Sequence, residues 1–271
     1  VMNAEGKARG VAYLDRNTHA AREVFAKVVV LAASTLESTR ILLNSTSSRF
    51  PSGVGNSNGV LGHYLMDHFT TEGAGGLMPT LKSSEREPEG RPCGFLIGKH
   101  ANTGSNANKN FLRGYRMDGD GSQSMYEHAF GIPGFGAGLR RKVREEIPTH
   151  FGMMAQGECL PRYENFMALD KQKKDAWGIP ALHISASFGE NELAMAKAMR
   201  QDLMNIMEAM KIPNPRPPRD GLSLFGKNIH ECGTARMGSD PKKSVLNKFN
   251  QVHDAKNVFV TDGACFTTQG P

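Results

Sequence analysis

The residues best suited to chemistry lie in the last part of the 271-residue chain, where His230 is followed by the compact pair Gly233-Thr234. An imidazole changes its protonation state near neutral pH and can therefore take up or release a proton during a reaction. Further on, Asp262-Gly263-Ala264 forms a small, sharply turning segment that a phosphate or another backbone can approach closely. Taken alone, a single histidine more often has a structural hydrogen-bonding role, and Asp262 is also consistent with a plain turn cap.

Two predicted strands position these groups. Val258-Phe259-Val260 is β-favouring and bounded by polar residues, which is typical of a short buried strand. Near the start of the chain, residues 10–14 and 24–33 are predicted strands joined by a polar turn at 15–18. The second of these is almost continuously apolar, which predicts a strand buried on both faces of an α/β sheet.

The second strand ends in small residues, Ala32-Ala33-Ser34, and leads into a predicted helix over residues 35–44. Its expected buried face carries four aliphatic side chains: Leu36, Ile41, Leu42 and Leu43. Small residues between a strand and a helix allow a cofactor to approach the backbone, but they also allow tight packing of the two elements. The pattern by itself does not separate these two interpretations.

Two longer motifs resemble one enzyme family. His230-x-x-Gly233-Thr234, with the segments 236–238 and 257–264, is similar to the C-terminal signature of the glucose–methanol–choline (GMC) flavin oxidoreductases. Residues 28–45 and 61–68, the latter ending in Asp67-His68, resemble the mid-chain signature of the same family. The sequence is most similar to its sugar-oxidising branch, which includes pyranose oxidases and bacterial sugar dehydrogenases.

The resemblance implies an FAD-dependent oxidoreductase that oxidises a CH–OH group of a sugar or another alcohol. His230 would accept the hydroxyl proton while the hydride passes to the flavin. The predicted cofactor contacts come from three segments, namely Ala32, Ala33 and Ser34 near the nucleotide half, Gly233 and Thr234 beside the flavin ring, and Asp262, Gly263 and Ala264 near the ribityl or pyrophosphate region. The acceptor that reoxidises the flavin, whether oxygen, a quinone or a cytochrome, stays open.

The implied fold is α/β, or α+β overall. Residues 1–68 and 228–271 are expected to belong to an FAD-binding Rossmann-like domain, and residues 69–227 to a substrate-binding domain with an antiparallel sheet and covering helices. In this middle region Gly73, Gly75 and Gly76 are predicted to form a turn, and strands are predicted at 93–97, 149–154 and 181–185. Part of the glycine-rich stretch 107–148 is expected to line or cover the substrate entrance.

One helix stands out in this middle region. Ser187-x-x-Glu190 has the form of a capping box, and Ile212-Pro213 is a stop signal. Between them a stripe recurs at helical spacing: Met195, Met199, Leu203, Ile206 and Met210. The stripe is interpreted as core packing against the sheet rather than as a cofactor-binding face.

GMC members begin with a strand, a Gly-x-Gly-x-x-Gly turn and a helix that bind the flavin pyrophosphate, and this sequence contains no such motif. The chain is therefore expected to be the C-terminal part of a larger enzyme, inactive alone, with the second catalytic residue beyond Pro271. The alternative is a non-enzymatic partner or binding subunit that retains the fold without a functional flavin site. A carbohydrate-binding module built from residues 69–227 is a weaker hypothesis.

Composition argues against several other classes. The net charge is +6, but the 33 Lys and Arg residues are spread along the chain without a basic helix or aromatic platform typical of nucleic-acid binding. No run approaches the ~20 apolar residues of a membrane span. The four cysteines have neither a disulfide framework nor metal-site spacing, so no metal site is predicted. His63 and His68 are predicted to be structural, hydrogen-bonded histidines.

Overall fold

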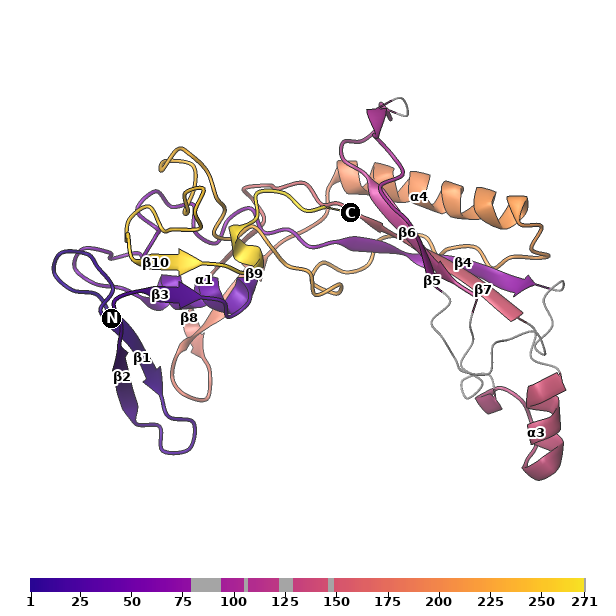
Figure 1. The fold of residues 1–271 in the computed structure, drawn as a ribbon, viewed down its shortest axis with the longest axis horizontal. Helices are drawn as coiled ribbons and strands as arrows, with labels where there is room; N and C mark the ends of the chain where they lie inside the picture. Colours follow the sequence, from indigo (N-terminus) through magenta and orange to yellow (C-terminus); the bar gives the residue numbers. More distant parts are fainter. Residues whose placement is uncertain (79–93, 105–106, 122–128, 146–148, 271) are drawn as a thin grey trace. The chain divides into compact units, whose positions relative to one another are not determined.

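The computed structural model describes residues 1–78, 94–104, 107–121, 129–145 and 149–270. The chain forms two compact units, whose elements are labelled in Figure 1. The first unit comprises Val1–His68, Cys159–Phe188 and Phe225–Gly270, and the second comprises Phe69–Glu158 and Gly189–Leu224. Residues 159–188 thus pack with the first unit, whereas the sequence placed them within the 69–227 domain.

The first unit begins with an antiparallel hairpin of β1 (Gly10–Leu14) and β2 (Ala21–Phe25). The next strand, β3 (Val29–Leu31), pairs in parallel with β10 (Val258–Val260). The prediction of one buried strand over 24–33 is therefore wrong: the chain changes partners between β2 and β3, and β2 is exposed throughout. Asn257 stabilises the break, because its side-chain amide donates to the carbonyls of Ala8 and Lys27 at 2.7 and 2.8 Å.

Helix α1 (Thr35–Asn44) has the predicted bounds. Leu42 and Leu43 are buried as expected, but Ile41 is 38% exposed. The remaining buried positions of α1 are polar: Thr35, Ser38 and Thr39. Their hydroxyls bond to the Glu231 carbonyl, to Asp262 at the start of the short 3₁₀ helix η3 (Gly263–Cys265), and to the Thr234 hydroxyl. The helix is thus built for polar contacts at its start and for aliphatic packing at its end.

A second hairpin, β8 (Phe166–Lys174) with β9 (Pro180–Ser185), also belongs to the first unit. The strand predicted at 181–185 exists, but its placement in the sheet of the middle domain is wrong. Arg40 of α1 anchors this hairpin, since its guanidinium donates to the Asp175 carboxylate at 2.8 Å and to the Pro180 carbonyl at 2.9 Å. These contacts lie more than a hundred positions apart in sequence, where no local pattern reports them.

The second unit contains a four-stranded antiparallel sheet in the order β4-β7-β6-β5. Its strands are β4 (Phe69–Met78), β5 (Gly94–Ile97), β6 (Tyr115–Asp120) and β7 (Thr149–Gly157). The glycines predicted as a turn lie inside β4, which corrects that prediction. A Cβ at Gly73 would lie 2.4 Å from the Met153 carbonyl oxygen, so glycine here serves close packing.

Helix α4 (Glu190–Ala209) packs on this sheet against β4 and β7 (Figure 1). Met195, Met199 and Leu203 are fully buried, which confirms the core interpretation of the stripe, and Met207 completes the face in place of Ile206 and Met210. The predicted cap is displaced by two residues. The Glu192 carboxylate accepts the Gly189 N–H at 2.8 Å, so the helix begins after Gly189 rather than after Ser187.

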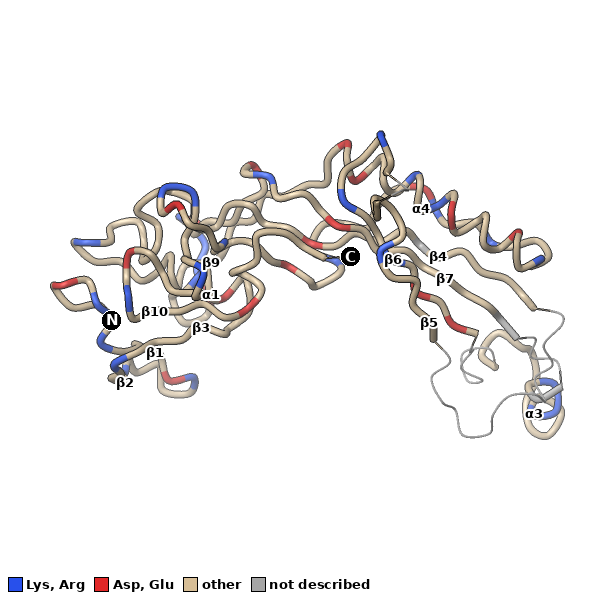
Figure 2. The backbone as a smooth tube through the Cα atoms, turned by 45° about the horizontal axis from the view of Figure 1, so that its top comes forward, with Lys and Arg blue, Asp and Glu red and all other residues tan. Residues whose placement is uncertain are grey.

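Helix α3 (Gly136–Glu145) lies within the stretch 107–148, part of which was predicted to line or cover the substrate entrance. Figure 2 colours several backbone positions of this helix as Lys or Arg, while positions of both charge signs are interspersed elsewhere along the tube. Residues 122–128 and 146–148, together with Cys93 of the predicted strand 93–97, lie outside the described residues. The entrance role of 107–148 stays a prediction. Within the described part of the chain, no helix combines the length and apolarity needed to cross a membrane.

Candidate functional site

The parallel pair β3 and β10 places two of the predicted cofactor segments at one sheet edge. Leu31 is in register with Val260, and the Thr261 N–H continues the ladder by donating to the Leu31 carbonyl at 2.9 Å. Ala32 to Ser34 and Asp262 to Ala264 therefore leave the sheet side by side. Ala32, Ala33 and Ser34 are exposed, so a group outside the unit can approach this segment.

Asp262 is joined to α1. The Ser38 hydroxyl donates to its carboxylate, and the Ala264 N–H donates to Oδ1 of the same group at 3.0 Å. Ser38 in turn accepts the Ala33 N–H at 3.1 Å. Asp262 thus caps η3, as the turn-cap interpretation expected, and the same chain of hydrogen bonds connects the two edge segments through α1.

The segment after His230 passes between these edge residues and residues 62–66. Gly233 N–H donates to the Gly263 carbonyl at 3.0 Å, and the hydroxyls of Thr234 and Thr39 lie 2.7 Å apart in the core. Gly233 has φ +98°, and a Cβ there would lie 2.5 Å from the Tyr64 carbonyl oxygen. Position 233 therefore requires glycine because the backbone of Tyr64 leaves no room for a Cβ atom.

His230 is exposed but is held at three points. Its backbone N–H donates to Asp67 Oδ1 at 3.1 Å, and its carbonyl accepts from Gln269 Nε2 at 2.9 Å. Its ring Nδ1 lies 3.2 Å from His68 Nδ1. An exposed imidazole with a fixed backbone and an oriented ring has the properties that a proton-accepting group requires.

Asp67 organises the loop that carries His230. It is fully buried, and Oδ2 accepts the N–H groups of Gly226 and Asn228 at 2.9 and 3.3 Å. The loop wraps so tightly that Ile229 adopts φ +53°, a left-handed conformation that is unfavourable for a β-branched residue. The buried carboxylate balances this strain by accepting several backbone donors at once.

Sequence reasoning missed Asp67, His68 and Gln269 as parts of this site. The signal for the first two was present, since they end the 61–68 segment that carries the family resemblance. His63 bonds the Tyr163 carbonyl at 2.7 Å and stacks on that ring at 3.8 Å, which confirms its structural role. His68 is hydrogen-bonded as predicted, and its partners include the ring of His230 and the Gly270 carbonyl.

Three buried cysteines with reduced thiols lie in the same unit: Cys159, Cys232 and Cys265. Burial, with a smaller contribution from nearby Cys159, raises the pKa of the Cys232 thiol to about 12. Cys232 is thus a neutral core group at physiological pH. Over the described ranges, no three His, Cys, Asp or Glu side chains form a group suited to a metal ion.

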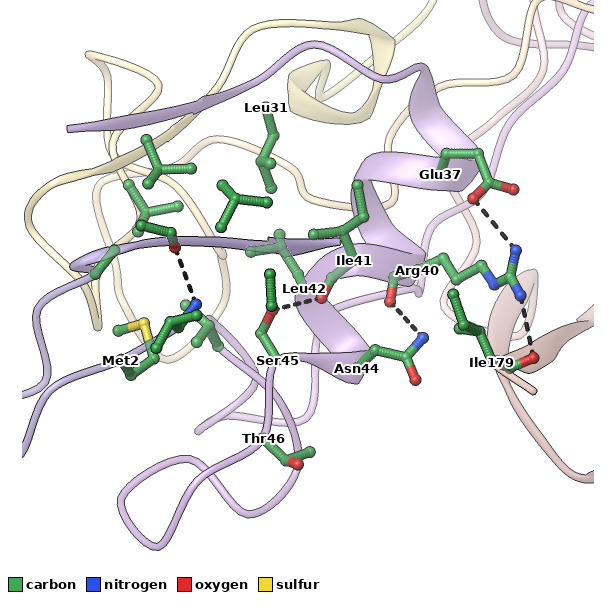
Figure 3. Close-up of a pocket in the computed structure, with 18 residues that line it drawn as sticks. Met2, Leu31, Glu37, Arg40, Ile41, Leu42, Asn44, Ser45, Thr46 and Ile179 are labelled. Atoms are coloured by element: carbon green, nitrogen blue, oxygen red, sulfur yellow. Dashed lines mark hydrogen bonds and ion pairs between the residues drawn. The ribbon is translucent and has the colours of Figure 1, made fainter. Parts of the chain in front are cut away.

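A separate cavity of about 390 Å³ opens beside β3 and α1 (Figure 3). Apolar side chains such as Met2, Leu31 and Leu42 line most of it, and Glu37 and Arg40 lie at one side. None of its lining residues belongs to the predicted site. The cavity is therefore distinct from the His230 segment and the sheet-edge residues.

Comparison with known sequences gives the same family as the motifs. Residues 161–271 match the family model described as GMC oxidoreductase. The chain is 32% identical to 2-methyl-1,2-propanediol dehydrogenase of Mycolicibacterium austroafricanum, covering 100% of this chain and 49% of that protein. It is 30% identical to the fructose dehydrogenase large subunit of Gluconobacter japonicus, covering 99% and 48%. The chain thus spans about half the length of the curated relatives it matches.

Solved structures share the fold. An FAD-dependent oxidoreductase from Chaetomium thermophilum matches with a TM-score of 0.58 at 12% identity, covering 100% of this chain and 56% of that chain. Pyridoxine 4-oxidase from Mesorbium loti matches with a TM-score of 0.52 at 15% identity, covering 98% and 51%. These likenesses confirm the predicted fold class.

Proposed function

Because the carboxyl-terminal part of this chain belongs to the GMC oxidoreductase family, we propose that the chain supplies the proton-accepting part of an FAD-dependent oxidoreductase. The substrate is a sugar or another alcohol, oxidised at a CH–OH group. The observation that carries the proposal is the convergence of His230 with both sheet-edge segments inside one compact unit. Two hydrogen bonds link the chain after His230 to this region: the Thr35 hydroxyl, directly after Ser34, donates to the Glu231 carbonyl at 2.6 Å, and the Gly233 N–H donates to the Gly263 carbonyl at 3.0 Å.

The sheet edge has the properties expected of a place for FAD. Ala32 to Ser34 are small and exposed, so a bulky group can approach their backbone closely. Helix α1 starts directly after them, and its N-terminus has no side-chain cap, which leaves its first N–H groups suited to an anionic phosphate. Ala32 to Ser34 would hold the nucleotide half, while Gly233-Thr234 and Asp262 to Ala264 would hold the flavin half.

In this proposal FAD, when bound, supplies the hydride acceptor. His230 takes the proton from the substrate hydroxyl, and Asp67 and Gln269 keep its backbone in place during the transfer. Thr234 is fully buried, with its hydroxyl engaged with Thr39 and its carbonyl accepting the Gly62 N–H at 2.7 Å, so it would support the flavin site from the core. The chain contains no Gly-x-Gly-x-x-Gly turn, and we therefore expect residues 1–271 alone to bind FAD weakly.

The test is an absorbance spectrum of the full-length protein before and after anaerobic addition of pyranoses, fructose or 2-methyl-1,2-propanediol. We expect flavin bands that bleach with at least one of these alcohols. His230→Ala should keep its flavin but lose about 10²–10⁴-fold in the bleaching rate, the usual contribution of a general base. His183→Ala, an exposed histidine of β9, serves as the matched control and should bleach normally. A colourless protein after flavin reconstitution would support the non-enzymatic alternative.

A further inference from the structure

His68 is placed between the ring of His230 and the main chain at Gly270. Its Nδ1 lies 3.2 Å from His230 Nδ1, and its Nε2 lies 2.5 Å from the Gly270 carbonyl oxygen. Both ring nitrogens of His68 are thus within hydrogen-bonding distance of a defined partner. The two imidazole rings meet edge to face, at 90°.

When both rings are neutral, these two contacts fix where the protons are. A carbonyl oxygen only accepts, so His68 Nε2 must carry a hydrogen and donate to Gly270. A neutral imidazole carries one N–H, and neutral His68 therefore has a bare, accepting Nδ1. The hydrogen between the two rings then belongs to His230 Nδ1. Neutral His230 consequently carries its lone pair on Nε2.

We propose that His68 is a positioning residue that holds His230 in the tautomer protonated at Nδ1, so that Nε2 is the nitrogen that accepts a proton. The chemical use of that nitrogen rests on the proposed function. The tautomer itself is inferred from the two hydrogen bonds of a neutral His68 and does not depend on the proposed function. The opposite tautomer, with hydrogen on Nε2, would place two lone pairs against each other between the rings.

The surrounding contacts keep the two rings in this arrangement. Asn228 Nδ2 donates to the His68 carbonyl at 2.6 Å, and Asp67 accepts the backbone N–H groups of Asn228 and His230. One loop therefore positions both histidines relative to the same buried carboxylate.

Proton uptake is compatible with the same hydrogen bond. When Nε2 of His230 accepts a proton, Nδ1–H of the resulting imidazolium still points at His68 Nδ1. The bond becomes charge-assisted and therefore stronger in the protonated state. His68 can thus keep the same hydrogen bond to His230 before and after the proton transfer.

Nitrogen-15 NMR of the full-length holoenzyme, with labelled histidine, tests this directly. The expected result is His230 protonated at Nδ1 in the wild type and in His68→Asn, whose amide oxygen can take the accepting place of Nδ1. In His68→Phe, which cannot accept, the Nε2–H form of His230 should appear. A wild-type His230 protonated at Nε2, or a His68→Phe spectrum identical to wild type, would overturn the proposal.

Kinetics provide the second measurement. His68→Phe should slow flavin reduction by about tenfold to a hundredfold, less than the ~10²–10⁴-fold loss of the base itself, with little change in KM. His68→Asn should recover most of that rate; equal losses in both variants would count against the tautomer role. The NMR measurement does not require the enzyme to turn over. If His230 is protonated at Nδ1 but no alcohol reduces the flavin, the proposed function is wrong and the tautomer inference still holds.

Discussion

The backbone N–H of His230 donates to the buried carboxylate of Asp67 at 3.1 Å, across 163 positions of sequence. The same carboxylate accepts the N–H groups of Gly226 and Asn228. A single side chain thereby determines the path of the loop that carries the proposed base. The site depends on this relationship as much as on the histidine itself.

Asp67→Asn tests the role of this carboxylate in the loop. The substituted amide presents N–H groups towards backbone donors, and we expect a loss of about 1–3 kcal/mol in the free energy of unfolding. Loosening of residues 226–230 should also speed tryptic cleavage after the exposed Lys227. Asp254→Asn is the control, because Asp254 accepts from Ser57 at the surface, and it should stay within about 0.5 kcal/mol of wild type. Equal protease resistance of the Asp67 variant and the wild type would contradict this role.

Gly233→Ala separates crowding from backbone strain. Gly233 and Gly178 both have positive φ, +98° and +81°, but only Gly233 has atoms that a Cβ would meet. The left-handed conformation costs roughly 1–2 kcal/mol for a non-glycine residue, and overpacking adds about 1–3 kcal/mol. Gly178→Ala should therefore show the first cost and Gly233→Ala the sum, in chemical denaturation of the full-length protein. Similar losses of unfolding free energy in the two variants would show that the backbone at Tyr64 moves to accommodate the new Cβ without destabilising the protein.

The sequence predicted best those helices whose position depends on neighbouring residues of the chain. The bounds of helix α1 agree with the predicted range 35–44. They could be predicted because apolar residues, a junction of small residues and a helical pattern of aliphatic residues follow one another in the sequence. The burial of Met195, Met199 and Leu203 in α4 followed from their spacing in the same way, whereas Met207 was not predicted. The glycines of β4 were misassigned, because glycine is equally typical of a turn and of a strand packed against another backbone.

Non-local pairing accounts for what the sequence did not predict. The hairpin of β8 and β9 was assigned to the wrong unit, because its anchor on Arg40 depends on residues 135 to 140 positions away. The candidate site shows the same limit. The motif residues were identified through the family resemblance, whereas the contact between His68 and His230 depends on the fold that joins residues 162 positions apart.

The raised pKa of Cys232 predicts a loss of stability in alkaline solution. The folded state holds the thiol proton up to a pKa of about 12, while the thiol of the unfolded chain has its ordinary pKa near 9.0. The folded state therefore binds more protons between these values, and stability that is complete below pH 9 falls as the pH rises towards 12. The slope for one thiol is at most about 1.4 kcal/mol per pH unit. Unfolding free energies at pH 8 and 10.5 should show a smaller decline for Cys232→Ala than for the wild type; parallel declines would refute the prediction.

Helix α4 offers a matched pair of leucines for testing the core of the second unit. Leu203 is fully buried, whereas Leu193 on the same helix is 55% exposed. Leu203→Ala removes buried methyl groups and leaves a cavity, so we expect a loss of about 2–5 kcal/mol, while Leu193→Ala should cost about 0.5 kcal/mol or less. Because α4 packs on β4 and β7, hydrogen exchange should accelerate in those strands in the Leu203 variant. Unchanged exchange in both strands would mean that α4 does not stabilise the sheet it covers.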